Sequence, residues 1–239
     1  MTLGPGNHDH QEHICSKIRS LLIDLTNEPS NYDQIAQKVE YWIEYVLRQC
    51  FATVDELVVG VSSVARESGG SYASVGRFLK EFHDAPHRSE QARTFVTQLC
   101  PFVLRSFAIS SVEDLWFISY SRGSISNNGP APGFIRAASF VGYLIEWSLL
   151  SRELIRQHLV KPLISHHQKY DNELSPDIVR ATAIYQLFAA AGNSLLCGLL
   201  GTEDVQVCFE ILDSRHRWIT GFDPAKLQVW CISHNDSPY

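Results

Sequence analysis

The sequence predicts an all-α protein, an α-solenoid of about nine or ten antiparallel helices. Three observations carry this prediction. Apolar residues recur at offsets of three and four along most of the chain, as a period of 3.6 requires. The segments between these stripes hold helix-start and helix-stop residues. No run shows sustained strand alternation between hairpin turns.

Residues 14–47 read as two amphipathic helices joined by a short polar turn. Such a pair must bury its stripes against further pairs, which is the unit of a solenoid, where function comes from surfaces more than from pockets. The first stripe holds Ile14, Ile18, Leu21, Leu22 and Leu25, and the second holds Ile35, Val39, Trp42, Ile43, Val46 and Leu47.

The next three helices are marked by their ends. The run 53–56 (TVDE) is a capping box, and the glycines at 69–70 should stop the helix that it opens. Ser71 begins a shorter helix, and Ser89 caps the one after it. Pro101 lies inside that last helix and should kink it, because proline lacks a backbone N–H.

Residues 121–133 (SRGSISNNGPAPG) form the clearest break and are predicted to be a long internal loop. A loop of this length in a compact helical protein is either disordered or used for binding. The helices on both sides are alike in kind. We therefore expect one domain spanning 1–239, with a flexible N-terminus over 1–12.

Beyond the loop, residues 133–150 should form a central buried helix whose small residues let its neighbours approach closely. Ser151 can cap the following helix. The run 175–177 (SPD) places a cap, a first-turn proline and an acid at the next helix start. Thr202 and the Asp-Pro pair at 223–224 should open the two final helices.

Composition narrows the class of protein. The 239 residues include 45% hydrophobic residues and carry a formal charge of −6, which argues against a surface that grips nucleic acid throughout. The longest weakly polar run, 187–201, is shorter than the ~20 residues of a membrane span. Neither a signal peptide nor a C-x-x-C pair is seen. We therefore expect a cytoplasmic protein, with the nucleus as the alternative, whose six cysteines are reduced and mostly buried.

Three segments resemble the middle domain of the eukaryotic translation initiation factor 4G family, a HEAT-like helical repeat. The opening KIRSLLIDLTNEPSNYDQIAQKV is similar to that family's first helical pair. IRAASFVGYLIEWSLLSRELIRQHLVKPLI resembles its central segment, and SPDIVRATAIYQLFAAAGNSLL resembles the helix that follows. Tyr143 stands where the family's pattern would have a glutamate. Together the three segments cover most of residues 14–200.

The resemblance implies a small stand-alone scaffold or regulator of mRNA translation, processing or decay, without enzymatic activity. Its partner would be a protein, such as a DEAD-box helicase or a relative of the initiation machinery, with RNA bound weakly or not at all. No membrane contact and no cofactor are expected. A homodimer stays open as an alternative.

The histidines suggest the main alternative function, that of a metal-dependent enzyme. His8, His10 and His13 lie in NHDHQEH, and His-Asp doublets occur at 8–9 and 83–84. All-α metal-dependent phosphohydrolases use such a doublet, but they need a further histidine and aspartate from other helices. The chain offers no convincing set, so no catalytic or metal-binding residue is predicted.

Two basic clusters are the candidate surface for a partner or for RNA. The first, Arg152, Arg156 and Lys161, lies on one predicted helix and is by default a solvated face. The second mixes cations with an aromatic ring, which suits an acidic partner or RNA stacking. It consists of Arg215, Arg217, Trp218 and Lys226.

Overall fold

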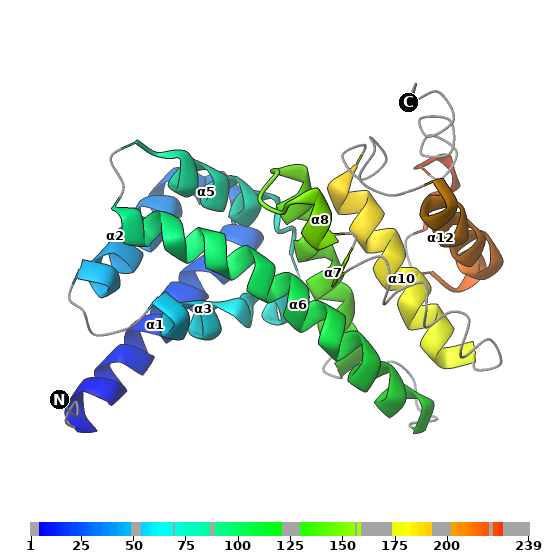
Figure 1. Cartoon of the computed structure of the whole chain (residues 1–239), viewed down its shortest axis with the longest axis horizontal. Coiled ribbons are helices and arrows are strands. Elements are labelled where there is room, and N and C mark those ends of the chain that lie inside the picture. Colours follow the sequence, from blue (N-terminus) through cyan, green and yellow to red (C-terminus); the bar gives the residue numbers. More distant parts are fainter. Residues whose placement is uncertain are drawn as a thin grey trace. The chain divides into compact units, whose positions relative to one another are not determined.

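The computed structural model (Figure 1) describes residues 5–48, 54–68, 70–86, 89–120, 130–155, 157–158, 174–192, 202–219 and 222–226. Over these ranges it contains ten α-helices, two 3-10 helices and no strand. The predicted all-α class is therefore confirmed. Stacking of the helices as a repeat solenoid stays a prediction. Within the same ranges, no helix is both long and apolar enough to cross a membrane.

The chain divides into two compact units, residues 1–103 and 104–239. The division falls inside a helix, α6 (Glu90–Tyr120), and does not coincide with the predicted loop at 121–133. Each unit has its own buried residues. The prediction of one cooperative domain is not tested by this division.

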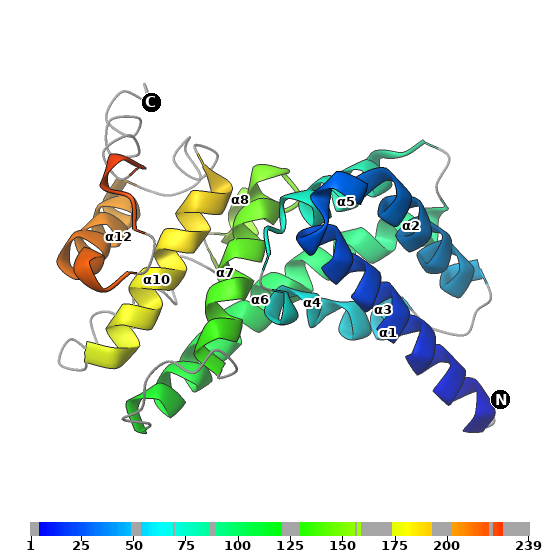
Figure 2. The same ribbon diagram turned by 180° about the vertical axis from the view of Figure 1, so that it is seen from behind.

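In the N-terminal unit, α1 packs against four other helices. Figure 2 shows this long helix from the side opposite to Figure 1. The 3-10 helix η1 (Pro29–Asn31) joins α1 to α2. The five helices are α1 (Pro5–Asn27), α2 (Tyr32–Arg48), α3 (Val54–Ser62), α4 (Val64–Glu67) and α5 (Ala73–Asp84).

The predicted stripes of the first pair form much of this unit's core. Ile18, Leu25, Val39 and Ile43 are fully buried, as expected from their spacing. Two members of the predicted stripes differ, because Leu21 and Trp42 are only partly buried. Both lie at the margins of their stripes, where a helix face turns towards solvent.

The first helix begins earlier than predicted. The segment 1–12 was expected to be flexible, whereas α1 starts at Pro5 and includes residues 5–12. Proline at the first helical position costs nothing there, because that residue's N–H would have no intrahelical partner.

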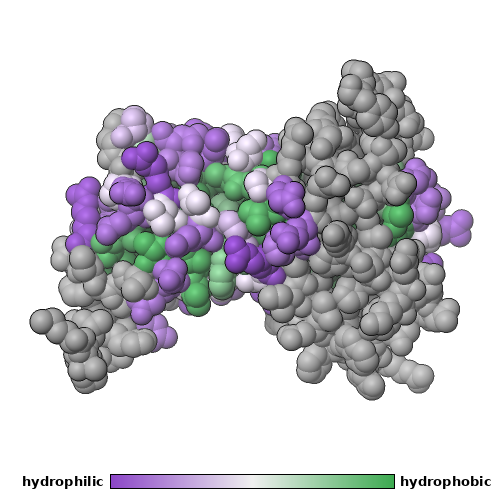
Figure 3. All heavy atoms as spheres, viewed as in Figure 1, coloured by the Kyte–Doolittle hydropathy of each residue, from purple (hydrophilic) through white to green (hydrophobic). Residues whose placement is uncertain are grey.

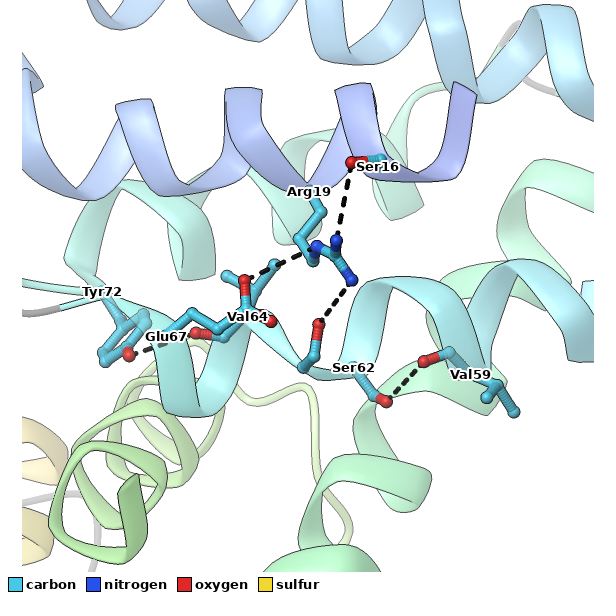
Figure 4. Close-up of polar contacts among 8 residues, drawn as sticks. Ser16, Arg19, Val59, Ser62, Val64, Glu67 and Tyr72 are labelled. Carbon is cyan, nitrogen blue, oxygen red and sulfur yellow. Dashed lines mark hydrogen bonds and ion pairs between the residues drawn. The ribbon is translucent and has the colours of Figure 1, made fainter. Parts of the chain in front are cut away.

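A turn at Ser63 separates α3 from α4, where one continuous helix was predicted. Arg19 of α1 reaches this turn (Figure 4). Its Nη1 lies 3.4 Å from Ser63 Oγ, and its Nε lies 3.5 Å from Glu67 Oε2. The guanidinium group therefore ties α1 to both sides of the break. The capping box before α3 includes Thr53, which lies outside the described residues.

Buried hydroxyl groups join the end of α1 to the segment after α4. Thr26 Oγ1 donates to the carbonyl of Ile23 at 2.7 Å and is also hydrogen-bonded to Ser68 Oγ. Ser68 Oγ in turn accepts the N–H of Gly70 at 3.1 Å. The Tyr72 hydroxyl is fully buried and lies within 3.2 Å of three backbone carbonyls of the α4 region. These contacts satisfy polar groups that would otherwise be costly to bury.

The C-terminal unit contains α7 (Pro130–Glu146), α8 (Arg152–Ile155), α10 (Leu174–Ala191), α12 (Thr202–Arg215) and η3 (His216–Trp218). The predicted loop was too long at its C-terminal end, because residues 130–133 are the first turn of α7. Its two prolines fit a first turn for the reason given for Pro5. The rest of the predicted loop, 121–129, lies outside the described residues.

The most extensive helix packing in this unit is between α7 and α10. A Cβ atom on Gly142 of α7 would lie 2.7 Å from Ala190 Cβ and 2.7 Å from the Leu187 carbonyl oxygen, so only glycine fits. The predicted close approach along the small residues of 133–150 is thus confirmed at this position. Phe107 and Phe134 stack nearly parallel, with ring centroids 4.8 Å apart.

Several predicted helix starts are confirmed by their capping bonds. Ser89 Oγ accepts the N–H of Ala92 at 3.2 Å, and Ser151 Oγ accepts the N–H of Leu154 at 3.3 Å. Asp223 Oδ1 accepts the N–H of Ala225 at 3.0 Å. Side-chain acceptors at these positions satisfy helix donors that have no backbone partner.

Candidate interaction surface

The first predicted basic cluster lies largely outside the described residues. Arg152 opens α8, but the structure describes nothing of its side chain. Arg156 and Lys161 are not described at all. The proposed grouping of these three residues therefore stays a prediction.

The second basic cluster lies on the segment that follows α12. Arg215 is the last residue of α12, and Arg217 in η3 and Lys226 are exposed. The side chain of Trp218 lies outside the described residues. Asp223 donates its N–H to the hydroxyl of Tyr185 on α10 at 3.1 Å, which anchors this segment within its unit. The structure does not show these cations converging on one point.

The histidine motifs show local contacts. His13 and the residues before it, including His8 and His10, belong to α1. His83 Nδ1 lies 2.8 Å from Asp84 Oδ1 on the exposed end of α5, and hydrogen bonds from His83 and Lys80 hold the pKa of the Asp84 carboxyl below its usual range. Among the residues that the structure describes, no three His, Cys, Asp or Glu side chains are grouped to hold a metal.

A group of three aromatic rings on α2 was not predicted as a site. Tyr41 and Tyr45 stack with ring centroids 6.2 Å apart, and each meets Trp42 nearly edge-on, at 5.3 and 5.6 Å. Tyr41 is 61% exposed, the largest exposed fraction of any large apolar or aromatic side chain in the described ranges. The ammonium group of Lys17 on α1 lies 4.2 Å from the centre of a Trp42 ring.

The spacing of these residues explains why they meet. Positions 38, 41, 42 and 45 are three or four residues apart, which places them along one side of an α-helix. The opposite side of α2 carries Val39 and Ile43 and is buried against α1 and α5. We call Lys17, Lys38, Tyr41, Trp42 and Tyr45 the aromatic surface.

The exposed side of α2 carries cations, neutral polar groups and two acids. Its exposed or half-exposed positions 34, 37, 38, 41, 45 and 48 are Gln, Gln, Lys, Tyr, Tyr and Arg, while Asp33 is exposed and Glu40 is half-exposed. The third acid of α2, Glu44, is buried with its Oε2 3.2 Å from Arg48 Nε.

The start of α2 is braced by α5. The Tyr32 hydroxyl donates to Glu81 Oε2 at 2.5 Å, and Arg77 Nε donates to Glu81 Oε1 at 2.7 Å. The Arg77 guanidinium also lies 4.1 Å from the centre of the Tyr32 ring. Burial and the bond to Glu81 raise the pKa of Tyr32. Partial burial raises the pKa of Glu81, but the bonds from Tyr32 and Arg77 outweigh it, so that its pKa is lowered overall.

Other exposed features of this unit are smaller. Figure 3 shows apolar side chains reaching the surface between hydrophilic ones, and Val59 and Phe102 are 57% and 36% exposed. A shallow, open hollow on the first turns of α6 is lined by Glu90, Arg93, Thr94 and Thr97. Neither feature combines aromatic rings with cations as the aromatic surface does.

Comparison with known proteins adds no family assignment. No protein-family model matches the chain, and no curated protein or solved structure is similar to it. The resemblance to the initiation factor 4G middle domain stays a prediction.

Proposed function

We propose that this protein is a non-enzymatic interaction module, a scaffold or regulator in mRNA translation, processing or decay. The observation that carries the proposal is the aromatic surface on α2. Its rings, Tyr41 exposed and Trp42 and Tyr45 half-exposed, lie on a helix whose other side is firmly packed, so a partner would meet a preformed surface.

Exposed aromatic clusters of this kind suit protein recognition. Tyr and Trp supply much of the binding energy at interfaces, because they bury large areas with few rotatable bonds. Here the rings restrain one another, and Lys17 covers one side of Trp42. Little side-chain freedom would then be lost on binding, which favours affinity.

The assignment to mRNA metabolism rests on the resemblance of residues 14–200 to the middle domain of initiation factor 4G. By that resemblance the partner is a DEAD-box helicase or a relative of the initiation machinery, and the protein acts in the cytoplasm. Nothing in the geometry of the aromatic surface favours a second, enzymatic function.

A pull-down from the native organism's lysate, with and without ribonuclease, tests the proposal. We expect a protein partner that survives ribonuclease and is lost with the double substitution Tyr41→Ala and Tyr45→Ala. Val59→Ala is the matched control, because it also shortens an exposed apolar side chain in the same unit but lies on α3. Partners that all disappear with ribonuclease would make RNA the primary ligand.

Any RNA binding should be weak and confined to the basic segment after α12. We expect the charge reversals Arg215→Glu and Arg217→Glu to abolish it while the fold stays intact, as judged by circular dichroism. A patch with few phosphate contacts should show a small log–log salt slope, roughly −0.7 per contact for single strands. Tight, sequence-selective RNA binding at physiological salt would contradict this ordering of ligands.

A further inference from the structure

We propose that the occupant of the aromatic surface is a short acidic peptide segment of a partner protein, carrying a leucine or an aromatic side chain among its carboxylates. This inference rests on the proposed function, whose partner it specifies by chemistry. Three observations carry it: the charge along α2, the charge of the unit around it, and the position of Lys17 over Trp42.

Two exposed lysines, Lys17 of α1 and Lys38 of α2, belong to the aromatic surface. Lys38 lies one helical turn before Tyr41 and Trp42, whereas Arg48, one turn after Tyr45, is paired with Glu44. The exposed carboxylate of α2, Asp33, lies about two helical turns before Tyr41, and the half-exposed Glu40 lies roughly 100° around the helix from Tyr41. Peptide carboxylates placed beside the rings would meet the two lysines, and such charge complementarity fixes orientation and suppresses wrong partners.

The N-terminal unit around the aromatic surface carries a net negative charge. Residues 1–103 include nine Lys and Arg against thirteen Asp and Glu, a net charge of −4. A long polyanion such as RNA would extend beyond the aromatic surface and meet this acidic excess. A short acidic segment presents only a few charges and can stay within reach of the cations.

The ring geometry also favours a peptide over a nucleobase. A base stacks on an open ring face. One face of Trp42 is already taken by the Lys17 ammonium, and both tyrosines meet the indole close to edge-on. An ammonium held over a ring still has N–H groups to give to a carboxylate. The exposed edge of Tyr41 beside it can then contact an apolar side chain of the same segment.

Selection from a random peptide-display library on the full chain tests the inference. Peptides that also bind the Tyr41→Ala, Tyr45→Ala variant are removed by counter-selection. We expect the remaining peptides to be acidic around a leucine or aromatic residue. Enrichment of neutral or basic peptides, or no peptide that depends on these tyrosines, would overturn the inference.

Binding of the best peptide is then measured by fluorescence anisotropy. We expect Lys17→Glu with Lys38→Glu to weaken it by about tenfold or more, and a peptide with Asn and Gln in place of its acids to bind at least as weakly. Arg93→Glu with Arg105→Glu is the matched control, because it also reverses two exposed helical cations, both outside the aromatic surface. An equal loss in that control would show a general charge effect and would count against the inference.

The proposed interaction module and the proposed acidic peptide are contradicted by different results. If the selected peptides are neutral but depend on Tyr41, the interaction module stands and its acidic partner does not. If the lysate partner is unaffected by Tyr41→Ala and Tyr45→Ala, the proposed function at this surface fails. An oligo(U) probe that displaces the peptide at physiological salt would assign the surface to RNA. Sedimentation showing that the wild type alone self-associates would assign it to a second copy.

Discussion

Gly70 shows at the scale of one residue how closely two backbone segments approach. A Cβ atom at this position would lie 2.6 Å from the Thr26 carbonyl oxygen and 2.8 Å from Asn27 Oδ1. The first of these atoms belongs to the backbone at the end of α1 and cannot move alone. We expect Gly70→Ala to lower the free energy of unfolding by about 1–3 kcal/mol, as overpacking does, measured by urea denaturation.

Gly60 is the matched control for this substitution. It lies inside α3, and an added Cβ atom would approach only a side chain, Cys15 Cβ, at 3.3 Å. The helix gains roughly 0.5–1 kcal/mol from alanine in place of glycine, which offsets the tighter contact. We expect Gly60→Ala to stay close to the wild type. Equal losses for both variants would mean that backbone approach at Gly70 is not the cause.

The hydrogen bond from Tyr32 to Glu81 should make stability depend on pH. The folded-state pKa of Glu81 is lowered, so its contribution is fully present above the ordinary pKa of a glutamic acid and is lost as pH falls through the folded-state value. We expect Tyr32→Phe to cost about 1 kcal/mol at pH 7. That cost should shrink below about pH 4. Urea denaturation at both pH values checks this, and a cost that grows in acid would contradict it.

Whole helices show which parts of the structure the sequence could predict. The caps at Ser89, Ser151 and Asp223 were predictable, because one side chain beside its own helix start fixes each of them. The prolines of 121–133 favoured a loop, but a proline that breaks a helix in its interior can open one at its first turn, as Pro130 does in α7. At the break between α3 and α4, Ser63 contacts Arg19 from another helix, and no local pattern reveals such a contact.

The candidate surface, too, was predictable only where local spacing along one helix determines it. The spacing of α2 predicted which side is buried, and the residues left over gave the exposed positions. The spacing alone does not mark Tyr41 and Tyr45 as a site, and it places Trp42 in the core, whereas Trp42 is half-exposed. What brings the site together is Lys17, which comes from α1 and is placed over the indole only by the packing of the pair. Of the predicted basic residues, Arg217 and Lys226 are exposed as a binding role would require.

The pairing of α7 with α10 gives a prediction at the scale of the element. Any side chain at Gly142 would push the two helices apart, because one of its nearest neighbours is the Leu187 carbonyl oxygen of α10. We expect Gly142→Ala to lower the melting temperature, at a cost of about 1–3 kcal/mol. Ser139→Ala on the same helix is the control and should stay within about 0.5 kcal/mol of the wild type. Similar losses in both would indicate that α7 tolerates no change at all.

At the scale of the whole molecule, α6 belongs to both compact units. Phe95, Val96, Leu99 and Val103 are buried in the first unit, and Phe107 stacks on Phe134 in the second. Half of a helix is marginal without its packing, so loss of one unit should weaken the other. We expect one calorimetric transition whose van't Hoff and calorimetric enthalpies agree. Two separate transitions, or independent melting of 1–120 and 134–239, would contradict the single-domain prediction.

The first unit is one continuous stretch of the chain, and this has a consequence for protein synthesis. Every residue of that unit precedes position 104, so its core is fully translated while the second unit is still being made. At about 5–20 residues per second, translation of residues 104–239 takes roughly 7–30 s, far longer than helix formation and collapse require. Helix formation and first contacts between α1 and α2 therefore have time to occur before the second unit, which we expect to complete the cooperative fold, has been translated.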